Sequence, residues 1–157
     1  MFSDFPDSSR LWIYASSRTF EDAELPMLRS QMKEFTRQWT SHQVQMRADA
    51  DILHNRFIVL IADESRVGAG GCSIDKSVSF LKSLQAEYDT DFFNRMIFSY
   101  MEGGTVHSVS REEFARRYAD GEIGEDTLVI DTLIANKADF EKGFVKPLSA
   151  SWHKRMI

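Results

Sequence analysis

Apolar residues recur with a helical period in two segments of the chain. Over residues 25–39 they lie three or four positions apart, which predicts a helix with one apolar face, and Pro26 suits its first turn. The same spacing predicts a second helix over residues 74–88. The predicted inward faces are Leu25, Leu28, Met32, Phe35 and Trp39 in the first helix, and Ile74, Val78, Leu81, Leu84 and Tyr88 in the second.

Around these helices the pattern changes to that of strands. LWIYA (11–15), the alternating QVQMRADAD (43–51) and RMIFSYM (95–101) predict three strands. RFIVLIADE (56–64) is a continuous apolar run and predicts a central strand that is buried on both faces. His54 and Asn55 are a turn signal in front of it.

The order strand–helix–strand–strand–helix–strand over residues 10–101 favours an α+β fold. We expect a ferredoxin-like (split β-α-β) sheet, with both helices covering one face. Residues 1–9, rich in Ser, Asp and Pro, predict a loose arm before it.

Residues 102–157 predict a smaller α+β unit that packs on this core. EGG (102–104) predicts a hairpin, and SREE (110–113) is a capping box for a helix that stops at Gly121. TLVIDTLIA (127–135) predicts a strand, and Asn136 a cap for a short helix.

Composition and charge narrow the class of protein. The 157 residues, 43% apolar, suffice for a core without a metal or disulfide. The net charge of −5 argues against a nucleic-acid surface, and no apolar run reaches the roughly 20 residues of a membrane span. The single cysteine and an N-terminus without signal-peptide features favour a cytoplasmic location.

The stretch GAGGCSIDKS (68–77) lies between a predicted strand and a predicted helix, as a phosphate-binding P-loop does. Residues 70–77 depart from that motif at Asp75, where a glycine would let backbone N–H groups wrap the phosphates. A carboxylate there opposes phosphate charge. Asp63 and Glu64 end the preceding strand and are better explained as a strand end in solvent than as a magnesium site.

The glycine loop could still form a simpler anion site that needs no P-loop. We expect the loops after the first and third strands to leave one sheet edge together, so that cations and two helix N-termini meet there. The alternative is a tight glycine turn, with Arg18 paired to Asp63 or Glu64. The residues predicted to bind an anion are Arg18, Arg66, Gly70, Gly71, Ser73, Lys76 and Ser77.

Cys72 is the one candidate catalytic residue. It precedes a predicted helix N-terminus beside Lys76, a setting that can activate a thiol as a nucleophile. No histidine can be placed next to it from the sequence, and a lone cysteine is more often a small buried filler. No metal site or cofactor is predicted, because the histidines are scattered; Asp49 and Asp51 suit a solvated strand end better than a cation site.

Trp152 and His153 stand near the C-terminus, and Trp152 predicts an anchor that docks the tail. As an alternative, the pair could form part of an interface with a partner.

Two resemblances add to these expectations. The pattern LWIY … QW … NRFIVLIADES … GAGGCSIDKSVSF … PLSASWHKRMI covers nearly the whole chain and resembles a family of short bacterial proteins that carry the label "ABC transporter ATPase". That label implies nucleotide hydrolysis. The chain departs from it at Asp75 and has no transporter-ATPase signature sequence.

Residues 105–130 (TVHSVSREEFARRYADGEIGEDTLVI) resemble the bacterial GYF-like module, a small fold that binds peptides or partner proteins. VHSV stands where that family has a Gly-Pro-Tyr-like segment, so the resemblance implies the fold element and an interaction role only. The matching positions are Gly121, Ile123, Asp126, Thr127, Leu128 and Val129.

These features favour a non-enzymatic cytoplasmic protein that binds a partner protein or a small anion. The alternative is a small-molecule enzyme that uses Cys72 on a phosphorylated or carboxylated substrate. A nucleotide hydrolase, as the family label implies, is the third hypothesis.

Overall fold

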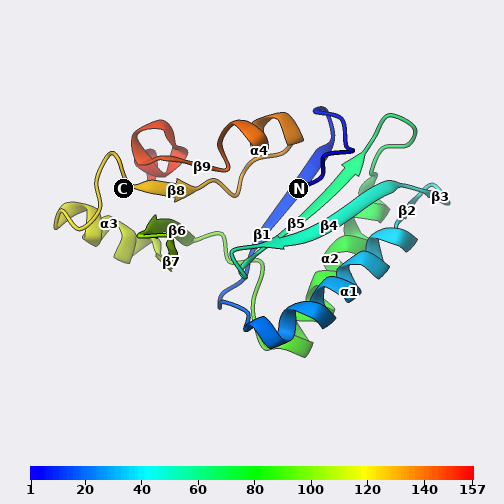
Figure 1. Cartoon of the computed structure of the whole chain (residues 1–157), viewed down its shortest axis with the longest axis horizontal. Coiled ribbons are helices and arrows are strands. Elements are labelled where there is room, and N and C mark those ends of the chain that lie inside the picture. The colour runs from blue at the N-terminus through cyan, green and yellow to red at the C-terminus, as the bar shows by residue number, and fades with distance from the viewer.

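The computed structural model describes residues 1–157 and has an α+β fold with four α-helices and three small sheets, as the sequence predicts (Figure 1). No helix is both long and apolar enough to cross a bilayer. The helices are α1 (Leu25–Gln38), α2 (Gly71–Tyr88), α3 (Arg111–Ala119) and α4 (Lys137–Gly143), and the strands are β1 (Arg10–Ala15), β2 (Thr40–Ser41), β3 (Val44–Gln45), β4 (Arg47–Leu53), β5 (Phe57–Asp63), β6 (Ile97–Glu102), β7 (Thr105–Ser110), β8 (Leu128–Ile130) and β9 (Val145–Pro147).

The first sheet has the strand order β1-β5-β4, and both pairs are antiparallel. It contains a split β-α-β unit, because α1 connects β1 to β4 while β5 lies between them. His54 and Asn55, each with a φ of 52°, form the predicted turn between β4 and β5. Residues 57–62 of β5 are fully buried, as a run that is apolar on both faces requires.

The predicted fourth strand of a ferredoxin-like sheet is not part of this sheet. β6 lies in a second sheet, of order β7-β6-β8-β9. Gly103 and Gly104, with φ of 58° and 83°, close a tight hairpin that gives β7 one edge of β6, and β8 takes the other. The predicted boundary between the ferredoxin-like core (10–101) and the smaller C-terminal unit (102–157) therefore falls within β6.

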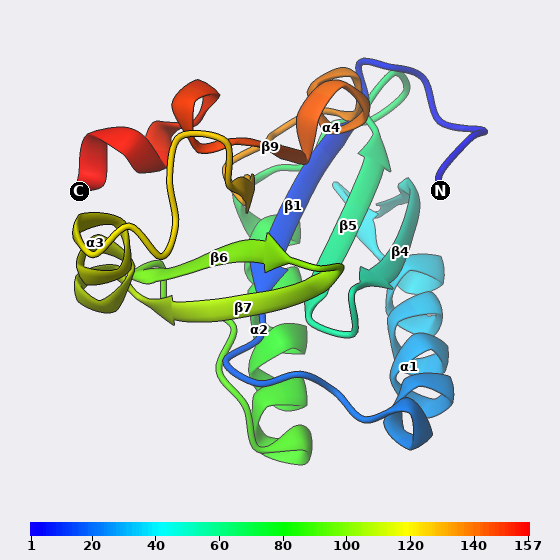
Figure 2. The ribbon, with the colours of Figure 1, turned by 60° about the vertical axis from the view of Figure 1, so that its left-hand side comes forward.

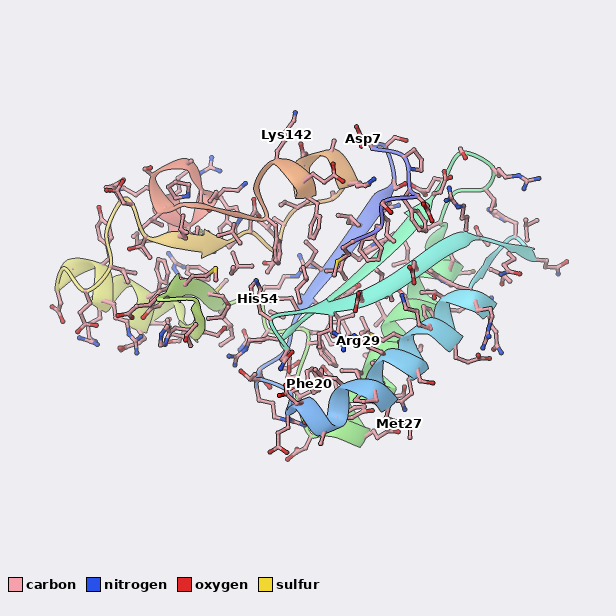
Figure 3. The ribbon with its side chains drawn as sticks, in the orientation of Figure 1. Asp7, Phe20, Met27, Arg29, His54 and Lys142 are labelled. Carbon is pink, nitrogen blue, oxygen red and sulfur yellow. The ribbon has the colours of Figure 1, made fainter.

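Both long helices cover one face of the first sheet, as predicted (Figure 1). The inward face of α1 is confirmed, and Met27 projects away from the sheet on its outer side (Figure 3). At the start of α2, Ser73 and Ser77 are buried in place of the predicted Ile74 and Val78. Their small side chains allow close packing, and their hydroxyls donate to carbonyls of their own helix.

The other face of the first sheet is covered by the N-terminal segment, α4 and the β6–β7 hairpin (Figure 2). The prediction of a loose arm over residues 1–9 is wrong, because Phe2 and Phe5 are each only 9% exposed. Burial of one such side chain contributes about 1.5–3 kcal/mol, which holds the segment against the sheet.

The second sheet has a core of its own with α3 and the C-terminal tail. Ser110 and Asn136 cap their helices as predicted, accepting hydrogen bonds from the Glu113 N–H at 3.2 Å and the Asp139 N–H at 2.9 Å. The second half of the predicted capping box is wrong, because the Glu113 carboxylate bonds to Arg116 and Arg117 instead of to Ser110.

Candidate binding site along strand β1

The residues predicted to bind an anion fall at opposite ends of the first sheet. In the antiparallel register, Ala15 at the end of β1 lies opposite Phe57 at the start of β5. The chain therefore leaves β1 and β5 at opposite ends of the sheet. The expectation that Arg18 lies beside the glycine loop is wrong.

Arg18 instead closes the far end of α2. Its guanidinium makes a bidentate ion pair with Glu24, at 2.8 and 2.7 Å, and donates to the Tyr88 carbonyl at 2.6 Å. The hydrogen bonds from Arg18 lower the pKa of Glu24 to about 2. Tyr88 is the last residue of the 18-residue α2, about 27 Å along the helix from the glycine loop.

At the glycine loop itself, fewer of the predicted residues face outward. Ser73 and Ser77 are buried, and their hydroxyls donate to the carbonyls of Gly70 and Ile74 at 2.8 and 2.6 Å. Lys76 donates to the Thr40 hydroxyl at 3.1 Å. The structure thus keeps Arg66, Gly70, Gly71 and Lys76 together at one loop, and anion binding there stays a prediction.

Cys72 is exposed on the first turn of α2, so the alternative of a buried filler is wrong. His42 is the histidine nearest the loop in space, since a Cβ placed on Gly70 would lie 3.7 Å from its Nε2 atom. It stands at the tip of the β2–β3 hairpin, where no sequence signal connected it to the loop. Catalysis by Cys72 stays a prediction.

The C-terminal tail is docked on the second sheet. His153 is 1% exposed, its Nδ1 lies 2.6 Å from the Ser151 hydroxyl, and its ring stacks on Trp152 at 3.8 Å. Burial, aided by the charge of Lys146, lowers the pKa of His153 to about 4, although Asp131 acts in the opposite direction.

The anchor interpretation of Trp152 fits this arrangement, because its indole N–H donates to Asp131 at 2.9 Å. A partner cannot reach His153 in this docked tail. Trp152 is only half-buried and lines a cavity that sequence reasoning missed.

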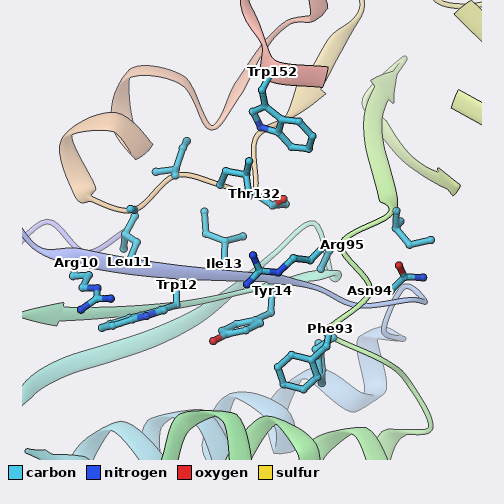
Figure 4. Close-up of a pocket in the computed structure, with 16 residues that line it drawn as sticks. Arg10, Leu11, Trp12, Ile13, Tyr14, Phe93, Asn94, Arg95, Thr132 and Trp152 are labelled. Carbon is cyan, nitrogen blue, oxygen red and sulfur yellow. The ribbon is translucent and has the colours of Figure 1, made fainter. Parts of the chain in front are cut away.

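This cavity, of about 260 Å³, runs along β1 and is called here the β1 groove (Figure 4). Its walls are β1, the connection 92–97, the segment 132–135 and Trp152. Most of the lining side chains are apolar. Its segments are far apart in the sequence, so no local pattern could predict it.

The outer edge of β1 is only partly paired. The Leu11 N–H donates to the Ala135 carbonyl and the Lys137 N–H to the Ser9 carbonyl, both at 2.9 Å. These bonds show that odd-numbered residues of β1 direct their backbone groups outward, because such groups alternate along an antiparallel strand. Beyond them, no protein group pairs with the Leu11 carbonyl, the Ile13 N–H and carbonyl, or the Ala15 N–H.

Side chains around this open edge combine aromatic rings with positive charge. Tyr14 packs edge-on against Phe93 at 5.7 Å between ring centroids, and burial raises the pKa of Tyr14, although the charge of Arg95 acts in the opposite direction. Arg95 points into the groove near Ile13 and Tyr14 (Figure 4). At the rim, Leu133 is 56% exposed.

Comparisons with protein-family models, curated proteins and solved structures gave no match to this chain. The two family resemblances therefore stay predictions.

Proposed function

We propose that this protein is a non-enzymatic binding protein that receives an extended segment of a partner protein along the outer edge of β1. The observation that carries the proposal is the row of unpaired backbone groups from the Leu11 carbonyl to the Ala15 N–H, in a groove lined mostly by apolar residues. Adding a peptide strand to a free sheet edge is a common mode of recognition: backbone hydrogen bonds give affinity, and pockets for alternate side chains give specificity.

The dimensions of the groove support a short segment. Residues 11–15 of β1 extend over about 17 Å, which a partner strand of about five residues would match. The cavity of about 260 Å³ lies just below the ~300–1,000 Å³ range of small-molecule sites, and every residue of β1 from Arg10 to Ala15 lines it.

The order of the strands also supports an added strand at this place. β5 occupies the inner edge of β1, and β4 follows on the far side of β5. The outer edge of β1 is where the fourth strand of a ferredoxin-like sheet would pair, and here β6 has left it for the second sheet. In this proposal, the partner strand completes a ferredoxin-like sheet.

The other hypotheses have less support. Cys72 and the four histidines lie outside the β1 groove, and the predicted anion site has lost Arg18 from the glycine loop. An enzyme that uses Cys72, a nucleotide hydrolase and a cytoplasmic location stay predictions.

The proposal is tested by panning the protein against a displayed library of random seven-residue peptides. We expect the selected peptides to slow amide hydrogen exchange at Ile13 and Ala15, with little change at Trp12 and Tyr14, whose amides already pair with β5. Failure to select any peptide, or selected peptides that leave Ile13 and Ala15 unprotected, would overturn the proposal.

A further inference from the structure

Resting on this proposed function, we infer that the partner segment carries an acidic side chain, held by Arg95, between apolar residues that enter the β1 groove. The geometry places the exposed positive charge of Arg95 in a groove lined mostly by apolar residues, beside an open strand edge (Figure 4). The recognised chemistry is therefore an extended, acidic and apolar peptide.

The charge of the groove is opposite to that of the molecule. The chain has 24 Asp and Glu residues against 19 Lys and Arg, yet no Asp or Glu lines the groove, whereas Arg10 and Arg95 do. Most arginines of this chain meet a carboxylate, as Arg18 meets Glu24 and Arg47 meets Asp63. Arg95 forms no ion pair within the chain, so its charge is available to an incoming carboxylate.

Arg10, at the other end of the groove, is also weakly engaged. Its guanidinium is 3.9 Å from the Glu64 carboxylate and lies over the Trp12 ring at 4.8 Å. A segment with a second acidic residue toward this end would meet Arg10. An acidic side chain of the partner is needed more at Arg95 than at Arg10, because no carboxylate of the chain pairs with Arg95.

The two walls of the groove set the alternation of the partner's side chains. Successive side chains of a strand point to opposite faces, so an added strand would alternate as β1 does. Side chains on the face of Tyr14 and Phe93 would lie near Arg95, and those on the face of Ile13 would meet Leu133 and Trp152. We therefore expect the acidic residue on the first face, with apolar neighbours on the second.

A second copy of this chain is a poorer occupant. If two β1 edges paired about a two-fold axis, the groove cations Arg10 and Arg95 of both copies would share one site. Like charges that face one another across paired strands are unfavourable. Acidic residues of a partner segment neutralise the same charges.

The test uses the library of the proposed function and its best selected peptide. We expect aspartate or glutamate to be enriched at one position of the selected sequences. Replacing that residue by its amide should weaken binding about fivefold, the size expected of a partly exposed charge pair, measured by calorimetry at low salt. The Arg95→Gln variant should bind the acidic peptide about fivefold more weakly and the amide peptide with unchanged affinity.

Lys142→Gln is the charge-matched control, because Lys142 is exposed on α4 outside the groove (Figure 3). It should leave the preference for the acidic peptide unchanged. Arg95→Glu should invert the preference toward a peptide with lysine at that position, which a merely structural role of Arg95 would not produce.

The outcomes separate the inference from the function it rests on. Equal affinity of acidic and amide peptides, with Ile13 and Ala15 still protected, would overturn the acidic partner and leave strand addition standing. No selected peptide would overturn both. Concentration-dependent protection of Ile13 without peptide would identify a second copy as the occupant and overturn the acidic partner.

Discussion

The two edges of the first sheet differ in how their outward backbone groups are satisfied. On β4, the outward N–H groups of Ala50 and Ile52 donate to the carboxylates of Asp49 and Asp51, both at 2.8 Å. On β1, the outward N–H groups of Ile13 and Ala15 have no protein partner. Two outward N–H groups of β4 are thus occupied by its own side chains, whereas the corresponding groups of β1 are left open.

The closed edge is also charged and tied to a helix. Asp49 pairs with Lys33 at 2.6 Å, and Asp51 pairs with Arg29 at 3.1 Å, both on α1. Charges on an edge strand discourage pairing with another chain, which is a common protection against aggregation.

The open edge is protected by its surroundings instead. The connection 92–97, the segment 132–135 and Trp152 form walls on either side of it. Pairing with another chain is therefore discouraged at β4 by charge, whereas β1 keeps free backbone groups inside a groove. A free edge inside a walled groove is what selective strand addition requires.

The largest expected effect comes from proline substitutions that separate inward from outward amides of β1. Tyr14 faces Ile58 in the ladder, so Tyr14→Pro removes a ladder hydrogen bond and the packing against Phe93. We expect it to lower the free energy of unfolding by at least about 3 kcal/mol. Ala15→Pro removes only an outward N–H and should cost less than about 1 kcal/mol, since edge positions tolerate proline. Urea denaturation measures both.

Tyr14→Ala is the control that isolates the loss of the side chain. If Ala15→Pro destabilised the protein as much as Tyr14→Pro, the Ala15 N–H would have a partner within the chain, and the comparison of the two edges would break.

The next effect concerns pH, because His153 supports a wall of the β1 groove through its stack on Trp152. Burial lowers the pKa of His153 from 6.5 to about 4 in the folded protein. The unfolded state therefore binds the proton more readily than the folded state does. The contribution of neutral His153 to the free energy of unfolding is complete above pH 6.5 and is lost as the pH falls toward 4. At pH 5 the loss is about 2 kcal/mol.

Denaturation at pH 7 and pH 5 checks this expectation, with His153→Gln as the comparison. The variant should be less stable at pH 7 but should lose less stability between the two pH values. Equal losses in both proteins would mean that His153 does not titrate as its burial implies. Trp152 fluorescence of the folded protein should change near pH 4, where His153 takes up its proton.

Much of the fold follows from local patterns. The apolar face of α1, the buried run of β5 and the caps at Ser110 and Asn136 need only near neighbours in the sequence. The partner of β6 could not be predicted in this way, since pairing with β7 or with β1 satisfies the same alternation. The order of elements alone predicts that β6 pairs with β1. In the structure β6 pairs with β7 instead, through the tight hairpin at Gly103 and Gly104.

The candidate site was harder to predict for a related reason. Placing Arg18 beside the glycine loop assumed that β1 and β5 end at the same end of the sheet, which antiparallel pairing excludes. The β1 groove exists because β6 is elsewhere, so its prediction needed the topology first. One signal was present: β1 reads RLWIYA, with a single charge at its first residue although it is an edge strand, whereas the other edge strand reads RADADIL.

The smallest expected effect tests the closed edge that this ADAD stretch forms. Replacing Asp49 and Asp51 together by alanine removes two acceptors for outward N–H groups and two partly exposed ion pairs. We expect a loss of about 1 kcal/mol in the free energy of unfolding, because such exposed interactions are individually weak. The paired asparagine variant keeps side-chain oxygens that can accept the N–H groups, so it should lose about half as much. The alanine variant should also self-associate at high concentration in sedimentation experiments, since its edge then lacks both carboxylates and is open to a second chain. Self-association of the asparagine variant to the same extent would assign the protection to charge alone, and a monomeric alanine variant would show that β4 is closed by something other than its two aspartates.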